Sequence, residues 1–308
     1  GELLPHLQNL DKLFRVLLKA RAKRGAIDFE TQETRMIFDE NGKIAQIVPE
    51  TRNDAHRLIE ECMLAANVCA SAFLEEHKQT CLYRVHAAPS EDKLQNLRAF
   101  LGEFALALGG GDDPRAKDYA LLLEKIKQRP DFQLLQTVML RSLRQAQYAP
   151  ENLGHFGLAY EAYTHFTSPI RRYPDLIVHR ALKAHIESSA REAALAEGLA
   201  EHCSDRSARA QRASNQVWTK LKRRYVAQHQ IGGLSLAKVV KASARGIKVY
   251  LQEWQTMAWL PSCAEPLPNV EEGQLLQVQV LSATESEITV GLVLPAHGPG
   301  LELTTRLA

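Results

Sequence analysis

Apolar residues recur at intervals of three and four over most of the chain up to about residue 230, a pattern that predicts amphipathic helices. The clearest case is residues 54–77, where Leu58, Cys62, Ala65 and Cys69 define one apolar face. The same spacing predicts further helices over residues 3–24, 90–108, 116–128, 131–144, 168–190 and 201–228. Short apolar runs predict strands over residues 27–30, 36–38, 44–48 and 82–86.

The pattern changes at Gly232. Five short runs beyond it predict strands, over residues 234–240, 247–251, 257–260, 275–281 and 288–294. Five strands within about 65 residues, separated by glycine-containing and charged turns, are typical of a small β-barrel of the OB type. The predicted fold class is therefore α+β, with a largely helical region over residues 1–228, a five-stranded barrel over 229–295 and a tail over 296–308.

Composition excludes several classes of protein. The 308 residues are 45% hydrophobic and 24% charged, which excludes a disordered or fibrous chain. No apolar stretch reaches the roughly 20 residues of a membrane-spanning helix, and the first residues do not resemble a signal peptide. Five cysteines without a CxxC pair argue against a disulfide framework or a zinc site, and favour a cytoplasmic location.

Charge is distributed unevenly, although the net charge of the whole chain is only +2. Between His202 and His229, seven basic residues accompany a single acidic residue, Asp205. That helix-length segment carries about three times the net charge of the chain. Such a concentration of positive charge favours a polyanionic partner for this region.

Aromatic and basic residues also lie close together in the predicted barrel. Tyr250, Trp254 and Trp259 are near Arg245 and Lys248 in the sequence. Aromatic faces beside basic side chains suit single-stranded nucleic acid, through base stacking and attraction to phosphates. The alternative is that two of the three aromatic side chains fill the interior of the barrel.

The most informative motif covers residues 163–175 and reads YTHFTSPIRRYPD. Ser168 and the proline after it predict the start of a helix. Arg171 and Arg172 would then lie at the positive end of the helix dipole, where a bound phosphate would relieve the conflict. The alternative is that Arg171 pairs with Asp175 or with a carboxylate in the core.

The helix predicted over residues 54–77 carries a second candidate. At 100° per residue, Glu61 lies at the margin of the apolar face and Glu60 nearly opposite to it. Glu60 is therefore expected in solvent, and Glu61 half-buried, where its carboxylate can accept a hydrogen bond from a sugar hydroxyl. Taken alone, the residues favour a salt bridge between Glu61 and Arg57 or another arginine. Phe29 taken alone is expected to be a core residue.

Five segments in order resemble the signature of the ribonuclease II/ribonuclease R (RNB) family of exoribonucleases: residues 21–30, 52–67, 83–86, 150–158 and 162–176. The resemblance is collinear from about residue 1 to 225. It implies that residues 1–228 are the C-terminal half of the RNB nuclease domain. Residues 229–295 resemble the family's S1-type domain more loosely, because Arg245-Gly246-Ile247-Lys248-Val249 replaces its usual Gly-Phe-Phe-Val stretch.

The family degrades RNA processively from the 3′ end and releases nucleoside 5′-monophosphates by Mg²⁺-assisted hydrolysis. The resemblance implies that Phe29 stacks on a base, Glu61 meets a ribose hydroxyl and Arg171 neutralises the scissile phosphate. It also implies that the Mg²⁺-binding aspartates, and the tyrosine that opposes Phe29, lie upstream of this chain. The expected RNA-binding set further includes Tyr163, His165, Ser168, Arg172, Arg223, Lys248 and Tyr250.

Three functions remain open from the sequence. The leading hypothesis is the distal part of a 3′–5′ exoribonuclease that acts on single-stranded RNA and needs the upstream half of its nuclease domain. The alternative is a catalytically inactive protein that binds RNA through the basic helix and the barrel. A helical interaction scaffold would show no RNA affinity. The resemblance adds that residues 211–216 lack the acidic residues usual in the family, which increases positive charge near the RNA.

Overall fold

The computed structural model describes residues 1–29, 33–50, 52–188, 195–262, 270 and 272–293. These residues form two compact units, one of residues 1–31 and 52–210 and the other of residues 32–51 and 211–308. The predicted tail over residues 296–308 lies outside the described residues, as do positions 30, 189–190 and 294 of the predicted elements. No described helix is long and apolar enough to cross a membrane.

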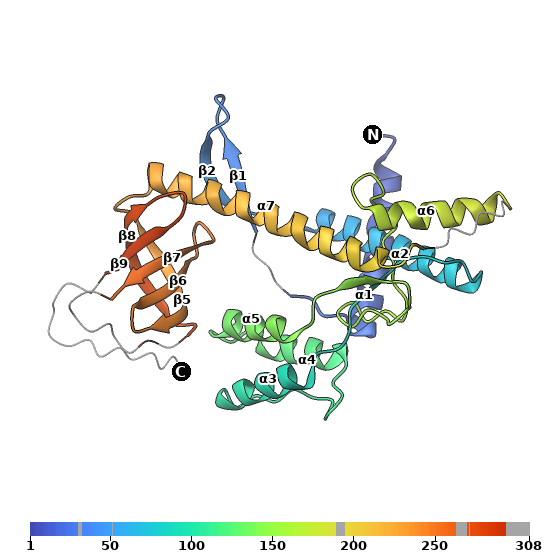
Figure 1. The fold of residues 1–308 in the computed structure, drawn as a ribbon, viewed down its shortest axis with the longest axis horizontal. Helices are drawn as coiled ribbons and strands as arrows, with labels where there is room; N and C mark the ends of the chain where they lie inside the picture. Colours follow the sequence, from blue (N-terminus) through green and yellow to red (C-terminus); the bar gives the residue numbers. More distant parts are fainter. Residues whose placement is uncertain (30–32, 51, 189–194, 263–269, 271, 294–308) are drawn as a thin grey trace. The chain divides into compact units, whose positions relative to one another are not determined.

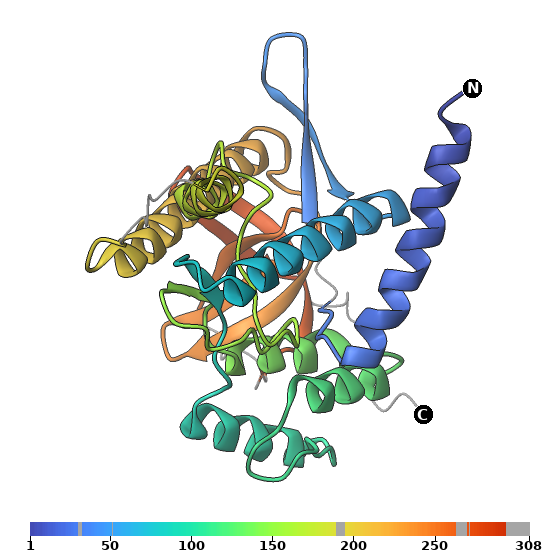
Figure 2. The same ribbon diagram turned by 90° about the vertical axis from the view of Figure 1, so that its right-hand side faces the viewer.

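The first unit is mainly helical (Figures 1 and 2). Its helices are α1 (Leu4–Arg24), α2 (Asp54–Glu76), α3 (Glu91–Glu103), α4 (Ala116–Ile126), α5 (Phe132–Ser142) and α6 (Tyr173–Ile186). Helix α2 contacts both α1 and α6, whereas α5 packs against α3 and α4 around a separate apolar cluster. A short antiparallel pair, β3 (Tyr83–Val85) and β4 (Gln147–Ala149), completes the unit.

The junction between α1 and α4 depends on Gly25. This residue ends α1 in the left-handed conformation, with φ of 78°. A β-carbon at this position would lie 2.6 Å from the β-carbon of Lys117, so the close approach of α4 leaves room only for glycine.

Helix α2 begins at a capping box, in which the Asn53 side chain accepts a hydrogen bond from the His56 N–H at 3.1 Å. Its buried residues are Glu61, Leu64, Asn67, Ala70, Ser71 and Leu74. The predicted centre of the buried face was therefore wrong, because Cys69 is exposed and Leu58 only half-buried. Polar side chains on the true face form buried hydrogen bonds, which a pattern of apolar residues does not reveal.

The other predicted helices of the first unit are confirmed, although the bounds of α3 and α6 differ from the prediction, and one predicted strand does not form. Helix α3 ends at Glu103, five residues before the predicted end, and residues 27–29 form no strand. Helix α6 begins at Tyr173 and not at Ser168. Pro174 occupies its first turn, whereas Ser168 accepts hydrogen bonds from the N–H groups of the two arginines in a separate turn.

The second unit is built on a closed five-stranded barrel with strand order β5-β6-β7-β9-β8, which confirms the OB-type prediction. The strands are β5 (Leu234–Ser243), β6 (Gly246–Leu251), β7 (Thr256–Pro261), β8 (Leu275–Ala283) and β9 (Ile288–Leu292). Neighbouring strands pair antiparallel except β7 and β9, which are parallel. Trp254 is 5% exposed and belongs to the core, so one predicted aromatic does fill the interior.

Two further elements pack on the barrel core. They are the hairpin of β1 (Glu33–Phe38) and β2 (Ile44–Glu50), through Met36 and Ile44, and the end of helix α7 (Leu199–His229), through Tyr225 and Val226. The hairpin therefore belongs to the second unit, although its sequence lies inside the first. The compact units divide within α7, at residue 210, and the domain boundary at residue 228 stays a prediction.

Candidate active site

The loop that precedes α6 is organised by Asp175. This carboxylate is fully buried and accepts hydrogen bonds from the Ser168 N–H at 2.8 Å and from Nε and Nη2 of Arg172 at 2.8 and 2.7 Å. The salt bridge considered for Arg171 is thus made by its neighbour. Arg172 is the N-cap residue of α6 and Arg171 precedes it, so neither lies in the first turn, contrary to the prediction. Asp175 balances the charge of Arg172 at the positive end of the helix dipole.

Arg171 itself is exposed at the tip of this turn. Within the described ranges, no hydrogen bond or ion pair engages its guanidinium group, while its N–H bonds back to the Ser168 carbonyl at 3.3 Å. The loop therefore holds the backbone of Arg171 in place and leaves its five N–H donors free for a ligand.

Asn67 of α2 anchors the same loop. Its Oδ1 accepts hydrogen bonds from the N–H groups of Phe166 at 2.9 Å and Thr167 at 3.2 Å, and its Nδ2 donates to the Tyr163 hydroxyl at 2.8 Å. Tyr163 is 5% exposed, so its side chain supports the loop and is not accessible on the surface. Asn67 was not predicted from the sequence. It continues the three-residue series of Glu61 and Leu64 along the buried face of α2, and this series was the available signal.

Two histidines near the loop, His155 and His165, carry no charge at neutral pH. Burial, with Arg172 and Arg84 nearby, lowers the pKa of His165 to about 3, and its Nδ1 hydrogen-bonds the Tyr148 hydroxyl at 2.8 Å. Burial, with His86 and Arg84 nearby, lowers the pKa of His155 to about 3. His165 is therefore suited to hydrogen bonding or stacking, and the positive charge that the loop presents to a phosphate comes from arginine.

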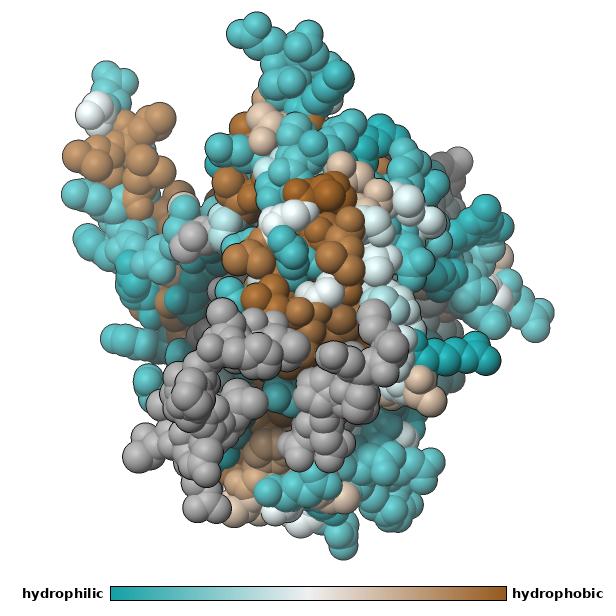
Figure 3. Space-filling view, turned by 90° about the vertical axis from the view of Figure 1, so that its left-hand side faces the viewer, coloured by the Kyte–Doolittle hydropathy of each residue, from teal (hydrophilic) through white to brown (hydrophobic). Residues whose placement is uncertain are grey.

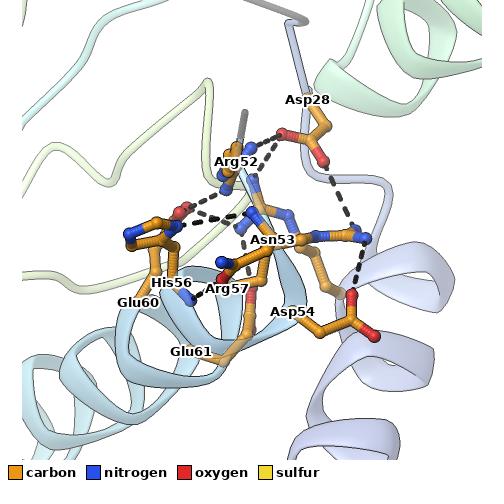
Figure 4. A network of polar contacts seen from close by, with 9 residues as sticks. Asp28, Arg52, Asn53, Asp54, His56, Arg57, Glu60 and Glu61 are labelled. Atoms are coloured by element: carbon orange, nitrogen blue, oxygen red, sulfur yellow. Dashed lines mark hydrogen bonds and ion pairs between the residues drawn. The ribbon is translucent and has the colours of Figure 1, made fainter. Parts of the chain in front are cut away.

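A second polar network joins α1 to the start of α2 (Figure 4). Arg21 is 8% exposed and contacts Glu61 at 2.7 Å, Glu60 at 3.2 Å and Asp28 at 3.2 Å. Arg52 contacts Glu60 and Asp28 as well. The prediction that Glu60 lies free in solvent was therefore wrong, because the carboxylate joins two arginines.

Glu61 is more deeply placed than predicted, at 4% exposed rather than half-buried. The salt bridge that the residues alone favoured does form, and its partner is Arg21 rather than Arg57. This contact uses Oε1, and no hydrogen bond from the described part of the chain engages Oε2. The carboxylate is thus held in a fixed orientation with one oxygen available to a donor.

A cavity of about 430 Å³ lies beside this network. Arg21, Asp28 and Arg57 line it on one side, and residues of α4 and Phe132 line the other. Phe29 follows Asp28 directly, is half-buried and packs against the apolar cluster of α3, α4 and α5. The core position expected from the residues alone is therefore partly met, and part of the ring remains accessible.

The acidic side chains that the structure describes do not form a metal site of their own. Over the described ranges, no group of three or more His, Cys, Asp or Glu side chains is placed to hold a metal ion. The nearest candidates, Asp28, Glu60 and Glu61, are all engaged by arginine. The Mg²⁺ that the resemblance implies has no binding site built from these carboxylates.

The remaining predicted RNA-binding residues lie in the second unit. Lys248 and Tyr250 alternate with the buried Ile247, Val249 and Leu251, so they face outward from β6. Their cross-strand partners on β7 are Trp259 and Met257, respectively. This register, which the sequence analysis did not use, brings Trp259 beside the predicted residues on the same outer face.

Two further features of this unit are the position of Arg223 and the outer face of β5 and β8. Arg223 is half-buried and donates to the Glu285 carbonyl at 3.4 Å, so it contributes less accessible charge than predicted. The outer face of β5 and β8 carries the exposed leucines Leu234, Leu236, Leu275 and Leu281, paired across the strands in part with Gln277 and Gln279. Figure 3 shows hydrophobic residues gathered on the side of the molecule that carries the barrel.

A sequence model of the RNB domain matches residues 2–188, more than half of the chain. The chain belongs to the RNB family. Ribonuclease R of Vibrio cholerae is 55% identical over 181 residues, which cover 59% of this chain and 22% of that protein. Ribonuclease R of Aquifex aeolicus is 36% identical over 255 residues, which cover 82% and 36%, respectively.

A solved RNB structure extends the match to the barrel. The apo form of Mycoplasma genitalium RNase R superposes with a TM-score of 0.85 at 23% identity, over 95% of this chain and 50% of that one. At this identity the likeness shows the fold, and it confirms the predicted α+β class and the barrel. The chain spans between a fifth and two fifths of the length of the curated relatives named above.

Proposed function

We propose that this chain is the distal part of a processive 3′–5′ exoribonuclease that hydrolyses single-stranded RNA to nucleoside 5′-monophosphates in the cytoplasm. The match to the RNB domain supports this proposal, and the solved M. genitalium RNase R complexes contain single-stranded and double-stranded RNA. Carboxylates of an upstream segment would hold Mg²⁺, since those that the structure describes form no metal site of their own. The observation that carries the proposal is the free guanidinium group of Arg171 on an anchored loop.

Arg171 is proposed to neutralise the scissile phosphate. The charge of Arg172 is balanced by Asp175, and the pKa of about 3 keeps His165 neutral. Arg171 therefore presents positive charge at this tip without an internal carboxylate to compete for it. A guanidinium group forms paired hydrogen bonds with phosphate oxygens, and it acts most strongly on charge that develops in the transition state.

Glu61 and Phe29 are proposed to contact the nucleotide that is removed. The free Oε2 of Glu61 suits a ribose 2′-hydroxyl, which is the group that distinguishes RNA from DNA. Its fixed orientation against Arg21 supports this role, because an anchored acceptor loses little entropy on binding. The accessible part of the Phe29 ring suits base stacking.

The outer face of the barrel is proposed to guide the single strand toward the nuclease domain. Lys248, Tyr250 and Trp259 combine a cation with two aromatic rings on adjacent strands. Bases stack on such rings with little sequence preference, and the lysine attracts the phosphates. This combination suits a processive enzyme that accepts many sequences.

The upstream half of the nuclease domain is proposed to cover the first turns of α1. Six apolar side chains of this segment are exposed: Leu3, Leu4, Leu7, Leu10, Leu13 and Val16. A continuous apolar row of this length is unusual on a free surface and typical of an interface. Its presence supports a partner segment that completes the domain.

The decisive experiment replaces Arg171 with alanine in the full-length enzyme. We expect the single-turnover rate of RNA hydrolysis to fall by about 10³-fold, because the contact acts on transition-state charge, while the RNA dissociation constant changes less than about threefold. Arg180→Ala, which removes an exposed arginine from α6, is the matched control and should alter neither quantity. Equal losses of rate and affinity would contradict the catalytic role. Binding without hydrolysis by the unmodified enzyme would favour the inactive RNA-binding alternative.

A further inference from the structure

The charges of this chain separate along its sequence more sharply than its net charge suggests. From Arg206 to Gln252 there are eleven basic residues and no acidic residue. The rest of the chain carries a net charge of −9. The acid-free stretch forms α7 from Arg206 onward and strands β5 and β6 of the barrel.

Four of these basic residues lie along one side of α7. At 100° per residue, Arg206, Arg209, Arg212 and Lys220 fall within about 120° of the helix circumference. We call these four residues the α7 stripe. Arg206 and Lys220 are separated by about 21 Å along the helix axis at 1.5 Å per residue. All four side chains are exposed.

The stripe faces away from the residues through which α7 packs. Cys203 and Ser204 contact the first unit, Cys203 in an apolar cluster and Ser204 through a hydrogen bond to the Tyr148 N–H. Tyr225 and Val226 belong to the barrel core. Helical geometry places these packing residues on the side of the helix opposite the stripe. The stripe is therefore not used to hold α7 in place.

The charged groups of the stripe also form no hydrogen bond or ion pair with the described residues, although Lys220 lies near enough to Glu285 to add to the lowering of its pKa by Arg224. Other cations of the helix differ, because Arg224 pairs with Glu285, and Lys222 donates to the Gln255 carbonyl at 3.3 Å. Unbalanced charge of one sign on a fixed helix attracts a polyanion.

We propose that the α7 stripe is a track for the RNA backbone, which binds phosphates of the substrate strand. The proposal rests on the proposed function, because it assumes that RNA is the ligand. A row of guanidinium and ammonium groups without exposed aromatic side chains among them suits phosphates rather than bases. A membrane surface is a poorer fit, since the exposed Trp218 lies on the side of α7 opposite the stripe and not beside it.

The test compares two variants from which three cations are removed. The stripe variant combines Arg206→Gln, Arg209→Gln and Lys220→Gln. The control combines Lys12→Gln, Lys19→Gln and Lys23→Gln, which are exposed lysines on one side of α1. Binding of a fluorescent adenylate-rich single-stranded RNA is followed by anisotropy as the salt concentration is varied. Thermal unfolding followed by circular dichroism verifies that both variants are folded.

We expect the stripe variant to lower the slope of log affinity against log salt by about two, since each phosphate contact on a single strand contributes about 0.7. At about 0.1 M salt this corresponds to roughly a hundredfold weaker binding. The control should change the slope by less than half as much. The single-turnover rate on saturating RNA should stay within about twofold, because the stripe contacts no reacting atom.

Two results would overturn the proposal while leaving the nuclease function intact. One is a slope in the stripe variant equal to that of the control. The other is unchanged RNA affinity with lost binding of polyglutamate, which would assign the stripe to an acidic protein. If instead the unmodified chain shows no salt-dependent RNA binding, the proposed function fails together with the stripe.

Discussion

Two charged regions of this molecule differ in whether their charges are paired. In the network between α1 and α2, Arg21 and Arg52 are surrounded by Asp28, Glu60 and Glu61, and every one of these groups has a partner of opposite sign. In the α7 stripe the charges have one sign, are exposed and form no ion pair with the described residues. Pairing inside the chain shows that a charge supports the fold, whereas an unpaired row of one sign is available to a ligand.

This criterion divides two neighbouring residues of the candidate active site. Arg172 is bound to the buried Asp175 and belongs with the network of α1 and α2. Arg171 is exposed and unpaired within the described ranges, so it resembles the residues of the α7 stripe. The same side-chain chemistry therefore supports the fold at one position and binding at the next.

The largest expected effect comes from breaking the paired region. Arg21→Ala would leave Glu61 buried without a cation, and removing one partner of a buried pair typically costs about 3–5 kcal/mol. We expect a loss of this size in the free energy of unfolding, measured by urea denaturation. Arg206→Ala is the matched control and should leave stability nearly unchanged. A loss below about 1 kcal/mol for Arg21→Ala would show that another cation replaces it.

The second-largest expected effect is a loss of stability of the first unit in acid. His155 and His165 have pKa values of about 3 in the folded protein, against about 6.5 in an unfolded chain. Between these values the unfolded state binds a proton on each imidazole and the folded state does not. Stability therefore falls as the pH falls from about 6.5 toward 3, by up to about 1.4 kcal/mol per pH unit for each histidine.

The measurement is urea denaturation at a series of pH values, with His165→Gln as the variant. Glutamine cannot take up the proton, so the pH dependence in this range should become shallower by the contribution of one histidine. An unaltered pH dependence in the variant would mean that the pKa of His165 in the folded protein is close to its value in the unfolded chain. The α7 stripe should show no comparable change, because arginine does not titrate in this range.

Most of the fold followed from local periodicity. The alternation after Gly232 predicted the five barrel strands, and helical spacing predicted α7 within two residues at either end. The assignment of each segment to one of the two compact units could not be predicted from periodicity. The hairpin of Met36 and Ile44 joins the core of Tyr225 and Val226, which lie almost two hundred residues later. Contacts of this range leave no signal in the hydrophobic pattern of either segment.

The sequence predicted which residues belong to the candidate site, but not which of them pair with one another. The motif that contains Arg171 identified the loop, and the position of Glu61 on α2 suggested burial. The partner of Glu61 depends on how α1 packs against α2, and the choice of Arg172 over Arg171 depends on where α6 begins. Each of these is a tertiary property, so the sequence left both alternatives open.

The smallest expected effect concerns an ion pair that is present but exposed. Arg224 of α7 contacts Glu285 through Nε at 3.1 Å, and both side chains are 54% exposed. Water solvates both charges well, so the pair should contribute nothing measurable to stability, in contrast to Arg21. The contact with Arg224 also lowers the pKa of Glu285. Arg224→Gln should therefore leave the urea midpoint unchanged at low and high salt. A clear loss of stability in this variant would show that exposure does not separate structural charges from the rest, and the contrast between the two regions would then rest on pairing alone.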